Sequence, residues 1–163
     1  MSNHNVLGII GGGQLGSMLC QAAKKLGVKT VIYCDDKNSP AQNYSNKFIC
    51  SKYNDETKIE EFANQVDVVT FEFENIPVPT LKKIQEIKPV YPDPNINFVI
   101  QNRSKEKKFI NQLGINTVDY KNIYSHKDID NVEKFLPGIL KTTTLGYDGK
   151  GQYIISNAKD FEN

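Results

Sequence analysis

A glycine-rich turn between an apolar run and a helical pattern constrains the fold of this chain more than any other feature. The apolar residues 6–10 are typical of a strand buried on both faces, and the sequence GGGQLG follows at once at positions 11–16. Apolar residues then recur at helical spacing over 15–26, Gly27 is the candidate helix end, and a second apolar run covers 28–34. The order strand, glycine turn, helix, strand predicts a βαβ unit.

The same alternation continues along the first part of the chain. Short apolar runs predict strands over 48–50 and 67–73, and helical patterns cover 55–65 and the segment that follows Pro77. Strands that alternate with helices form a mostly parallel sheet covered on both faces. The expected fold class is therefore α/β, with a Rossmann-like parallel sheet in the first domain.

A proline-rich segment over 88–97 marks the expected boundary between two domains, 1–94 and 95–163. The second domain is expected to be a smaller α+β lobe that begins with a long helix over 95–113. The remaining patterns predict a helix over 125–135 and strands over 117–121, 139–143 and 153–156. Because another helical pattern begins at Asn157 as the sequence ends, we expect this lobe to be incomplete.

Charge and apolar patterning argue against several classes of function. The 163 residues include 20 Lys plus Arg against 19 Asp plus Glu, so the chain lacks the positive charge typical of proteins that bind nucleic acid or anionic membranes. No apolar run approaches the ~20 residues of a membrane span, and the N-terminus has no secretory leader pattern. Three cysteines without a CxxC pair are typical of a reducing compartment, so we expect a cytoplasmic protein with buried, reduced thiols.

The glycine turn is the first of three clusters that could carry chemistry. Its spacing fits GxGxxG, and the backbone N–H groups at the start of the following helix attract a phosphate. Asp35 and Asp36, at the end of the second strand, are placed to accept hydrogen bonds from a ribose, as an acidic residue does in dinucleotide-binding folds. The pattern leaves open an NAD-dependent oxidoreductase, but also glycines that serve packing alone and aspartates in a solvated turn.

The second cluster is Glu72, Glu74 and Asn75, which close the strand expected over 67–73. Residues two apart on a strand share a face, so alternation predicts that both carboxylates project together at its carboxyl end. Ligands of open parallel sheets bind beyond that end of the strands. Two carboxylates and an amide suit a ligand with hydroxyl or amino groups. A charged surface loop, or a glutamate paired with a lysine, is the alternative.

The third cluster combines Lys141, on an expected strand, with the glycine-rich segment 146–152. Such a loop between two strands can donate backbone N–H groups to phosphates while the strand lysine supplies positive charge. The order of residues is not that of a P-loop, since GxxxxGK[ST] is missing. A tight hairpin without a ligand is the alternative.

In order and spacing, these clusters resemble the ATP-grasp carboxylases of purine synthesis, the family of 5-(carboxyamino)imidazole ribonucleotide synthases. The matching stretches are GGGQLG at 11–16, TFEFEN at 70–75, QNR at 101–103 with Lys107 and Phe109, and KTTTLGYDGKGQ at 141–152. The resemblance implies a pre-ATP-grasp domain followed by the first part of an ATP-grasp domain. It also implies an enzyme that uses ATP to activate bicarbonate and carboxylates the exocyclic amine of 5-aminoimidazole ribonucleotide.

The resemblance also implies roles for individual residues. The candidate substrate-binding residues are Gly13, Gln14, Leu15, Asp35, Glu72, Glu74 and Asn75. The candidate ATP-binding residues are Arg103, Lys141, Gly146, Tyr147, Asp148, Gly149, Lys150, Gly151 and Gln152. Among these, Tyr147, Asp148 and Lys150 are the candidate catalytic residues, and the Lys150 cation would stabilise the negative charge of carboxyphosphate.

Two departures from the family pattern limit what the resemblance implies. Many relatives have arginine where this chain has Ser17, so a contact made by that arginine is expected to be absent. The family's chains are longer, and the part missing here holds the acidic Mg²⁺ ligands. We therefore expect no metal ligand in this chain and no activity from it alone.

Relatives form homodimers, which makes a homodimer an expectation here. Formate-dependent glycinamide ribonucleotide transformylases and the amino-terminal part of biotin carboxylases remain alternative ATP-grasp enzymes.

Overall fold

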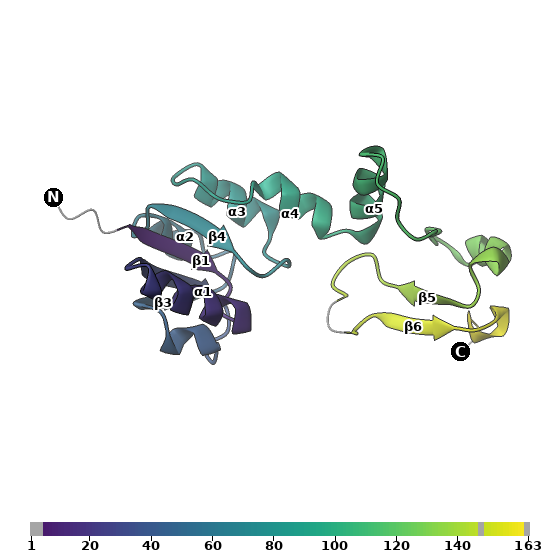
Figure 1. Ribbon diagram of the computed structural model, residues 1–163, viewed down its shortest axis with the longest axis horizontal. Helices are drawn as coiled ribbons and strands as arrows, with labels where there is room; N and C mark the ends of the chain where they lie inside the picture. The colour runs from purple at the N-terminus through teal and green to yellow at the C-terminus, as the bar shows by residue number, and fades with distance from the viewer. Residues whose placement is uncertain (1–4, 147–148, 162–163) are drawn as a thin grey trace. The chain divides into compact units, whose positions relative to one another are not determined.

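Four parallel strands form the sheet of residues 1–98, the first of two units in a computed structural model that describes residues 5–146 and 149–161 (Figure 1). The strands are β1 (Val6–Ile10), β2 (Lys29–Cys34), β3 (Lys47–Cys50) and β4 (Val68–Phe71), in the spatial order β3-β2-β1-β4. A parallel bridge between Val69 and Val90 lies beyond the named strands. The predicted α/β class and its parallel sheet are confirmed.

Helices cover both faces of this sheet, as parallel strands require. One face packs against α1 (Gln14–Lys25) and the short 3-10 helix η1 (Pro40–Asn43), where Ile9 and Ile32 meet Cys20 and Ala41. The other face packs against α2 (Glu56–Ala63) and α3 (Val78–Gln85). The buried side chains on this second face include Ile10, Tyr33, Ile59, Phe62, Leu81 and Ile84.

The ends of these elements follow from single residues. Gly27 has a φ of +72° just after α1, a backbone conformation that L side chains rarely adopt. Asp55 caps α2, because its carboxylate accepts from Lys58 N at 3.1 Å and from Ser51 Oγ at 2.6 Å. These hydrogen bonds, that from Ser51 first, lower the pKa of the Asp55 carboxyl.

The long helix predicted over 95–113 is wrong, since two helices occupy this segment. They are α4 (Pro94–Ile100) and α5 (Arg103–Gln112). Asn102 separates them: its backbone is extended, and its side-chain oxygen accepts from Ser104 N and Lys105 N, both at 3.1 Å. An asparagine that satisfies the first free N–H groups of one helix cannot also continue the helix before it.

Residues 99–163 form the second unit, which contains the antiparallel strands β5 (Gly138–Lys141) and β6 (Gln152–Ile155). The predicted strand over 117–121 does not form. The predicted helix over 125–135 is replaced by two 3-10 helices, η2 (His126–Asn131) and η3 (Glu133–Phe135), and the chain's last described element is η4 (Ala158–Phe161). Among the described residues of this unit, the buried hydrophobic side chains are Val132 and Ile155. Short helices depend on packing, so a unit with so few buried side chains holds them weakly.

Cysteine burial departs from expectation at one position. All three cysteines are free, and Cys20 and Cys34 are buried as expected, whereas Cys50 is exposed.

The domain boundary expected between 94 and 95 stays a prediction. Within residues 5–146 and 149–161, no helix has the length and apolar character needed to cross a bilayer.

Candidate functional site

The order of the strands places a crevice beyond the carboxyl ends of β1 and β4. The chain leaves β1 toward β2 and β3 on one side and later returns to β4 on the other, and open α/β sheets bind ligands at such a reversal. The register pairs Ile10 with Phe71, and Glu72 N donates to Ile10 O at 3.1 Å. This pairing brings the glycine turn and the segment 72–75 together, although about sixty positions separate them in sequence.

Three glycines of the turn are required by geometry. A Cβ on Gly12 would lie 2.8 Å from the Cβ of Ser39. Gly11 has a φ of +105°, and a Cβ there would lie 2.7 Å from the Oε1 atom of Glu72. A Cβ on Gly16 would lie 2.9 Å from the carbonyl oxygen of Gly11, which is backbone and cannot rotate away. A Cβ on Gly13 would make only an ordinary contact of 3.4 Å with Glu72 Oε1. Close approach of the β1 end, α1 and Glu72 therefore explains the first and last glycines.

The Glu72 carboxylate lies against the turn instead of facing outward. Gly13 N donates to Glu72 Oε1 at 3.0 Å, and the Glu72 residue is partly buried. Gly13 is the N-cap residue of α1 and has no side chain with which to cap the helix. Glu72 therefore satisfies the backbone N–H of the N-cap residue, which in a capping box bonds to a glutamate or glutamine at the third helical position.

The remaining predicted substrate residues lie more open to solvent. Gln14 and Leu15, in the first turn of α1, and Glu74 are exposed, and Asn75 is partly buried. The strand ends earlier than predicted, at Phe71, so strand alternation does not set the directions of the two glutamates. Strand alternation predicted the same orientation for Glu72 and Glu74. In the structure Glu72 is partly buried and accepts from Gly13 N, whereas Glu74 is exposed.

Asp35 and Ser17 complete this part of the site. Asp35 is exposed just after β2, while the neighbouring Asp36 accepts from Asn38 N at 2.8 Å in a local turn. The Ser17 side chain is buried, and its Oγ donates to Gly13 O at 3.0 Å. Ser17 thus stabilises the glycine turn from within α1.

In the second unit, β5 and β6 hold the predicted ATP loop at its two ends. Lys141 pairs with Gln152, and Thr142 N donates to Gly151 O at 2.9 Å. Gly151 has a φ of +63°, and a Cβ there would lie 2.5 Å from Thr142 Oγ1, so glycine is required at this position. Lys141 and the loop residues Gly149 and Lys150 are exposed. The candidate catalytic residues Tyr147 and Asp148 lie outside the described residues.

Arg103, at the start of α5, reaches the same loop. Its backbone N donates to Thr143 O at 2.9 Å, and its Nη2 donates to Gly146 O at 3.3 Å. The Arg103 Nε is buried and has no hydrogen-bond partner within the described part of the chain. A buried, unpaired cationic donor is costly, so its presence beside the loop favours a site for an anionic ligand.

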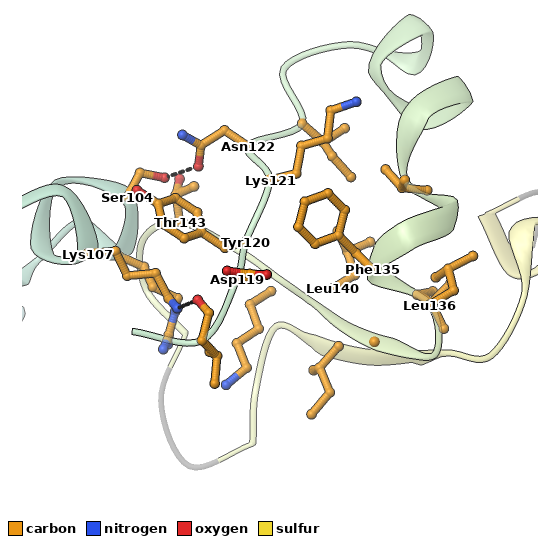
Figure 2. A pocket seen from close by; sticks show the side chains of 18 of the residues that line it. Ser104, Lys107, Asp119, Tyr120, Lys121, Asn122, Phe135, Leu136, Leu140 and Thr143 are labelled. Atoms are coloured by element: carbon orange, nitrogen blue, oxygen red, sulfur yellow. Dashed lines mark hydrogen bonds between the residues drawn. The ribbon is translucent and has the colours of Figure 1, made fainter. Parts of the chain in front are cut away.

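A cavity of about 440 Å³ lies within the second unit, with Ser104 and Lys107 on one side and Phe135 and Leu136 on the other (Figure 2). Four cationic residues and one acidic residue line it: Arg103, Lys107, Lys121, Lys141 and Asp119. Lys107 Nζ donates to Val118 O at 3.0 Å and lies 4.9 Å from the centre of the Tyr120 ring. Such a lining favours a negatively charged ligand with an apolar part.

Sequence reasoning missed the contribution of residues 118–123 to this cavity. It interpreted part of that segment only as a strand, and no motif distinguishes Asp119, Tyr120 or Lys121 from ordinary surface residues. Lys121 is fixed from outside the segment, since its Nζ donates to Asp128 O at 2.7 Å. The nearest sequence signal is Lys107, which the resemblance included without a role.

Comparisons with known proteins match both units. Residues 4–101 match the ribonucleotide synthetase pre-ATP-grasp domain, and residues 108–163 match the ATP-grasp domain. A bifunctional purine synthesis protein purC/E of Dictyostelium discoideum is 41% identical over 160 residues, which cover 97% of this chain and 16% of that protein. The N5-carboxyaminoimidazole ribonucleotide synthase of Staphylococcus aureus is 37% identical over 158 residues, covering 96% and 42%.

A solved structure gives the same result. The crystal structure of N5-carboxyaminoimidazole synthetase from Staphylococcus aureus complexed with ADP superimposes with a TM-score of 0.90 at 37% identity, covering 97% of this chain and 43% of that one. This chain spans less than half the length of these relatives.

Proposed function

We propose a function for this chain on the premise that it belongs to the ribonucleotide synthetase pre-ATP-grasp family, whose domain residues 4–101 match. The chain carries the substrate-binding unit and the first part of the ATP-binding unit of an ATP-dependent carboxylase in purine biosynthesis. The substrate is 5-aminoimidazole ribonucleotide, and the product is 5-(carboxyamino)imidazole ribonucleotide. The observation that carries this proposal is that relatives with this activity in their names align with 96% of the chain, across both units.

In the proposed reaction, bicarbonate attacks the γ-phosphate of ATP to give carboxyphosphate and ADP. The exocyclic amine of the aminoimidazole then takes the carboxyl group, and phosphate leaves. The chain's own residues bind and orient the reactants, and its cations stabilise negative charge as it moves from ATP to the new carbamate.

The first unit supplies the ribonucleotide site. Glu74 and Asn75 accept and donate hydrogen bonds to ribose hydroxyls or to the amine, and exposed Asp35 provides a further acceptor. Gln14 and Leu15 present a polar and an apolar contact from the first turn of α1. The exposure of these side chains at the carboxyl edge of the sheet supports this assignment.

The second unit supplies the ATP contacts. The buried Nε of Arg103 and the cation of Lys141 are donors for phosphate oxygens, and the backbone of the loop 146–152 adds neutral N–H donors. Tyr147, Asp148 and Lys150 keep their proposed catalytic roles. At Lys150, the positive charge stabilises carboxyphosphate and holds it for attack by the amine.

Magnesium is an expectation from the family, and no residue is assigned to it. Among residues 5–146 and 149–161, there is no group of three or more His, Cys, Asp or Glu side chains that could hold a metal ion. A Mg²⁺ ion bound with ATP would neutralise negative charge on the phosphates, and none of the roles proposed above depends on it. Use of bicarbonate, a homodimer and a cytoplasmic location likewise stay predictions.

Calorimetric titration of the chain with 5-aminoimidazole ribonucleotide tests the proposal. Saturable binding is expected for this ligand, and glycinamide ribonucleotide and NAD⁺, at the same concentrations, are expected to show none. Preference for glycinamide ribonucleotide would point to the formate-dependent transformylases, and binding of NAD⁺ alone would point to the oxidoreductase. Either result would overturn the proposed substrate.

A pair of variants then separates the two units. Glu74→Gln should weaken aminoimidazole ribonucleotide binding about tenfold, as expected for the loss of a charged hydrogen bond, and leave ATP binding unchanged. Lys141→Met should weaken ATP binding and leave ribonucleotide binding unchanged. Equal effects of each variant on both ligands would contradict the assignment of one ligand to each unit.

A further inference from the structure

The glycine turn binds a carboxylate of the chain itself, that of Glu72. Glu72 Oε1 accepts from Gly13 N at 3.0 Å, and it lies 2.7 Å and 3.3 Å from the positions that a Cβ would take on Gly11 and Gly16. The carboxylate therefore sits inside the curve of the turn, at the N-terminal end of α1. This is the place in a GxGxxG turn that a phosphate approaches.

The helix needs an external anion because its own sequence provides none. Gly13, its N-cap residue, has no side chain, and the first turn of α1 contains no acidic residue. The free N–H groups and the partial positive charge at a helix N-terminus favour a negative group close by. Glu72 meets both needs from the end of β4, 59 positions later in the sequence.

We infer that Glu72 is an internal substitute for phosphate, which excludes phosphate groups from the glycine turn and positions the backbone that carries Gln14 and Leu15. The Glu72 carboxylate accepts the hydrogen bond that the Gly13 N–H could otherwise donate to a ligand, and its negative charge repels a second anion at short range. The turn can therefore receive only uncharged polar groups of a ligand, such as hydroxyls. Glu72 is a positioning and specificity residue, whereas Glu74 is exposed.

This inference goes beyond the proposed function and stands apart from it, since it concerns what the turn binds and not which substrate the enzyme converts. It also explains why a GxGxxG sequence after a first strand need not form a dinucleotide site. In this chain the pyrophosphate of a dinucleotide would meet the Glu72 carboxylate where it needs the Gly13 amide.

The test follows the Gly13 amide by NMR while inorganic phosphate is added to the 163-residue chain, with sodium chloride at matched ionic strength as the reference. In the wild-type chain, the Gly13 signal should respond no more to phosphate than to chloride. In Glu72→Ala, it should shift saturably with phosphate, with an affinity about tenfold or more above any wild-type response, because a like charge at contact distance is removed. Glu74→Gln removes a charge two residues away and should gain no such response.

Hydrogen exchange at the same amide tests the positioning role. Exchange of the Gly13 N–H should become at least about tenfold faster in Glu72→Ala, which loses the acceptor, and should return toward the wild-type rate in Glu72→Gln, whose carboxamide oxygen can accept the same bond. Saturable phosphate binding at Gly13 in the wild-type chain would overturn the inference. So would a folded Glu72→Ala that gains no phosphate response. If Glu72→Ala does not fold, the wild-type titration and the Glu72→Gln exchange rate decide the question.

Discussion

Substitution of Gly11 by alanine is expected to destabilise the first unit more than the same change at Gly27, although both residues have a positive φ. At Gly27, with φ of +72°, no atom lies within 4 Å of a Cβ, so the cost is backbone strain alone. For alanine at such a φ, this strain is about 1–2 kcal/mol. Gly27→Ala is therefore the matched control for strain without a steric clash.

At Gly11 the new Cβ would also displace Glu72. The Cβ would lie 2.7 Å from Glu72 Oε1 and 3.0 Å from the carboxyl carbon, so the side chain must move and release Gly13 N. Loss of a charged hydrogen bond adds about 1.5–3 kcal/mol to the same strain of about 1–2 kcal/mol, and the sum for Gly11→Ala is about 2.5–5 kcal/mol. Because Glu72 is only partly buried, we expect a value in the lower half of this range.

The assay is native-state hydrogen exchange at the Ile9 and Ile10 amides of β1, which reports the first unit alone. A second pair of chains repeats Gly11→Ala in a Glu72→Ala background, where the clash is absent, and its cost should fall to the cost of strain. Equal costs of Gly11→Ala and Gly27→Ala in the wild-type background would refute this reasoning. An unchanged cost of Gly11→Ala in the Glu72→Ala background would refute it too.

Three further changes test separate features of the fold. Asn102→Ala should weaken α5 by about 1 kcal/mol through loss of its cap, seen as faster amide exchange in α5 but not in β1; equal loss in both would contradict it. Asp55 has a lowered pKa in the folded chain, so its contribution is present above about pH 4 and lost as the pH falls through that lowered pKa. The difference in melting temperature between wild type and Asp55→Asn should therefore shrink below about pH 4, and a constant difference would argue against this role. Phe62→Ala should cost about 3–5 kcal/mol in urea unfolding because Phe62 is fully buried, while exposed Glu60→Ala on the same helix should stay within about 0.5 kcal/mol.

The first unit could be predicted almost completely from the sequence. Its strands are short apolar runs that stop at glycine or at polar or charged residues, and burial on both faces leaves few other ways to place them. The helix over 55–65 was predicted with its buried residues Ile59, Phe62 and Ala63, and all three are buried in α2. Local pattern and tertiary packing agree in this unit, so a single sequence was enough.

The second unit could be predicted only in outline. The strands over 139–143 and 153–156 are present as β5 and β6, but the helix pattern over 95–113 concealed the cap at Asn102. Asparagine is unfavourable inside a helix and favourable at its N-cap. Apolar periodicity depends only on the positions of apolar residues, so it does not detect such a cap. At Ser125, a capping box with Asp128 closes a local turn, and 3-10 helices follow in place of the expected α-helix. Where few side chains are buried, such local hydrogen bonds decide the backbone.

The candidate site shows a different limit, because the sequence located its residues but not their partners. GGGQLG predicts a ligand at the carboxyl edge of the sheet through its backbone N–H groups, and TFEFEN predicts one through its carboxylates. In the structure the Gly13 N–H and the Glu72 carboxylate bond to each other. The register between β1 and β4 joins Gly13 to Glu72, and no local pattern contains that register. A glycine-rich turn after a first strand therefore has no fixed ligand preference of its own. The residue that follows the neighbouring strand determines whether the helix end is open to a phosphate or already holds a carboxylate, and in this chain it holds Glu72.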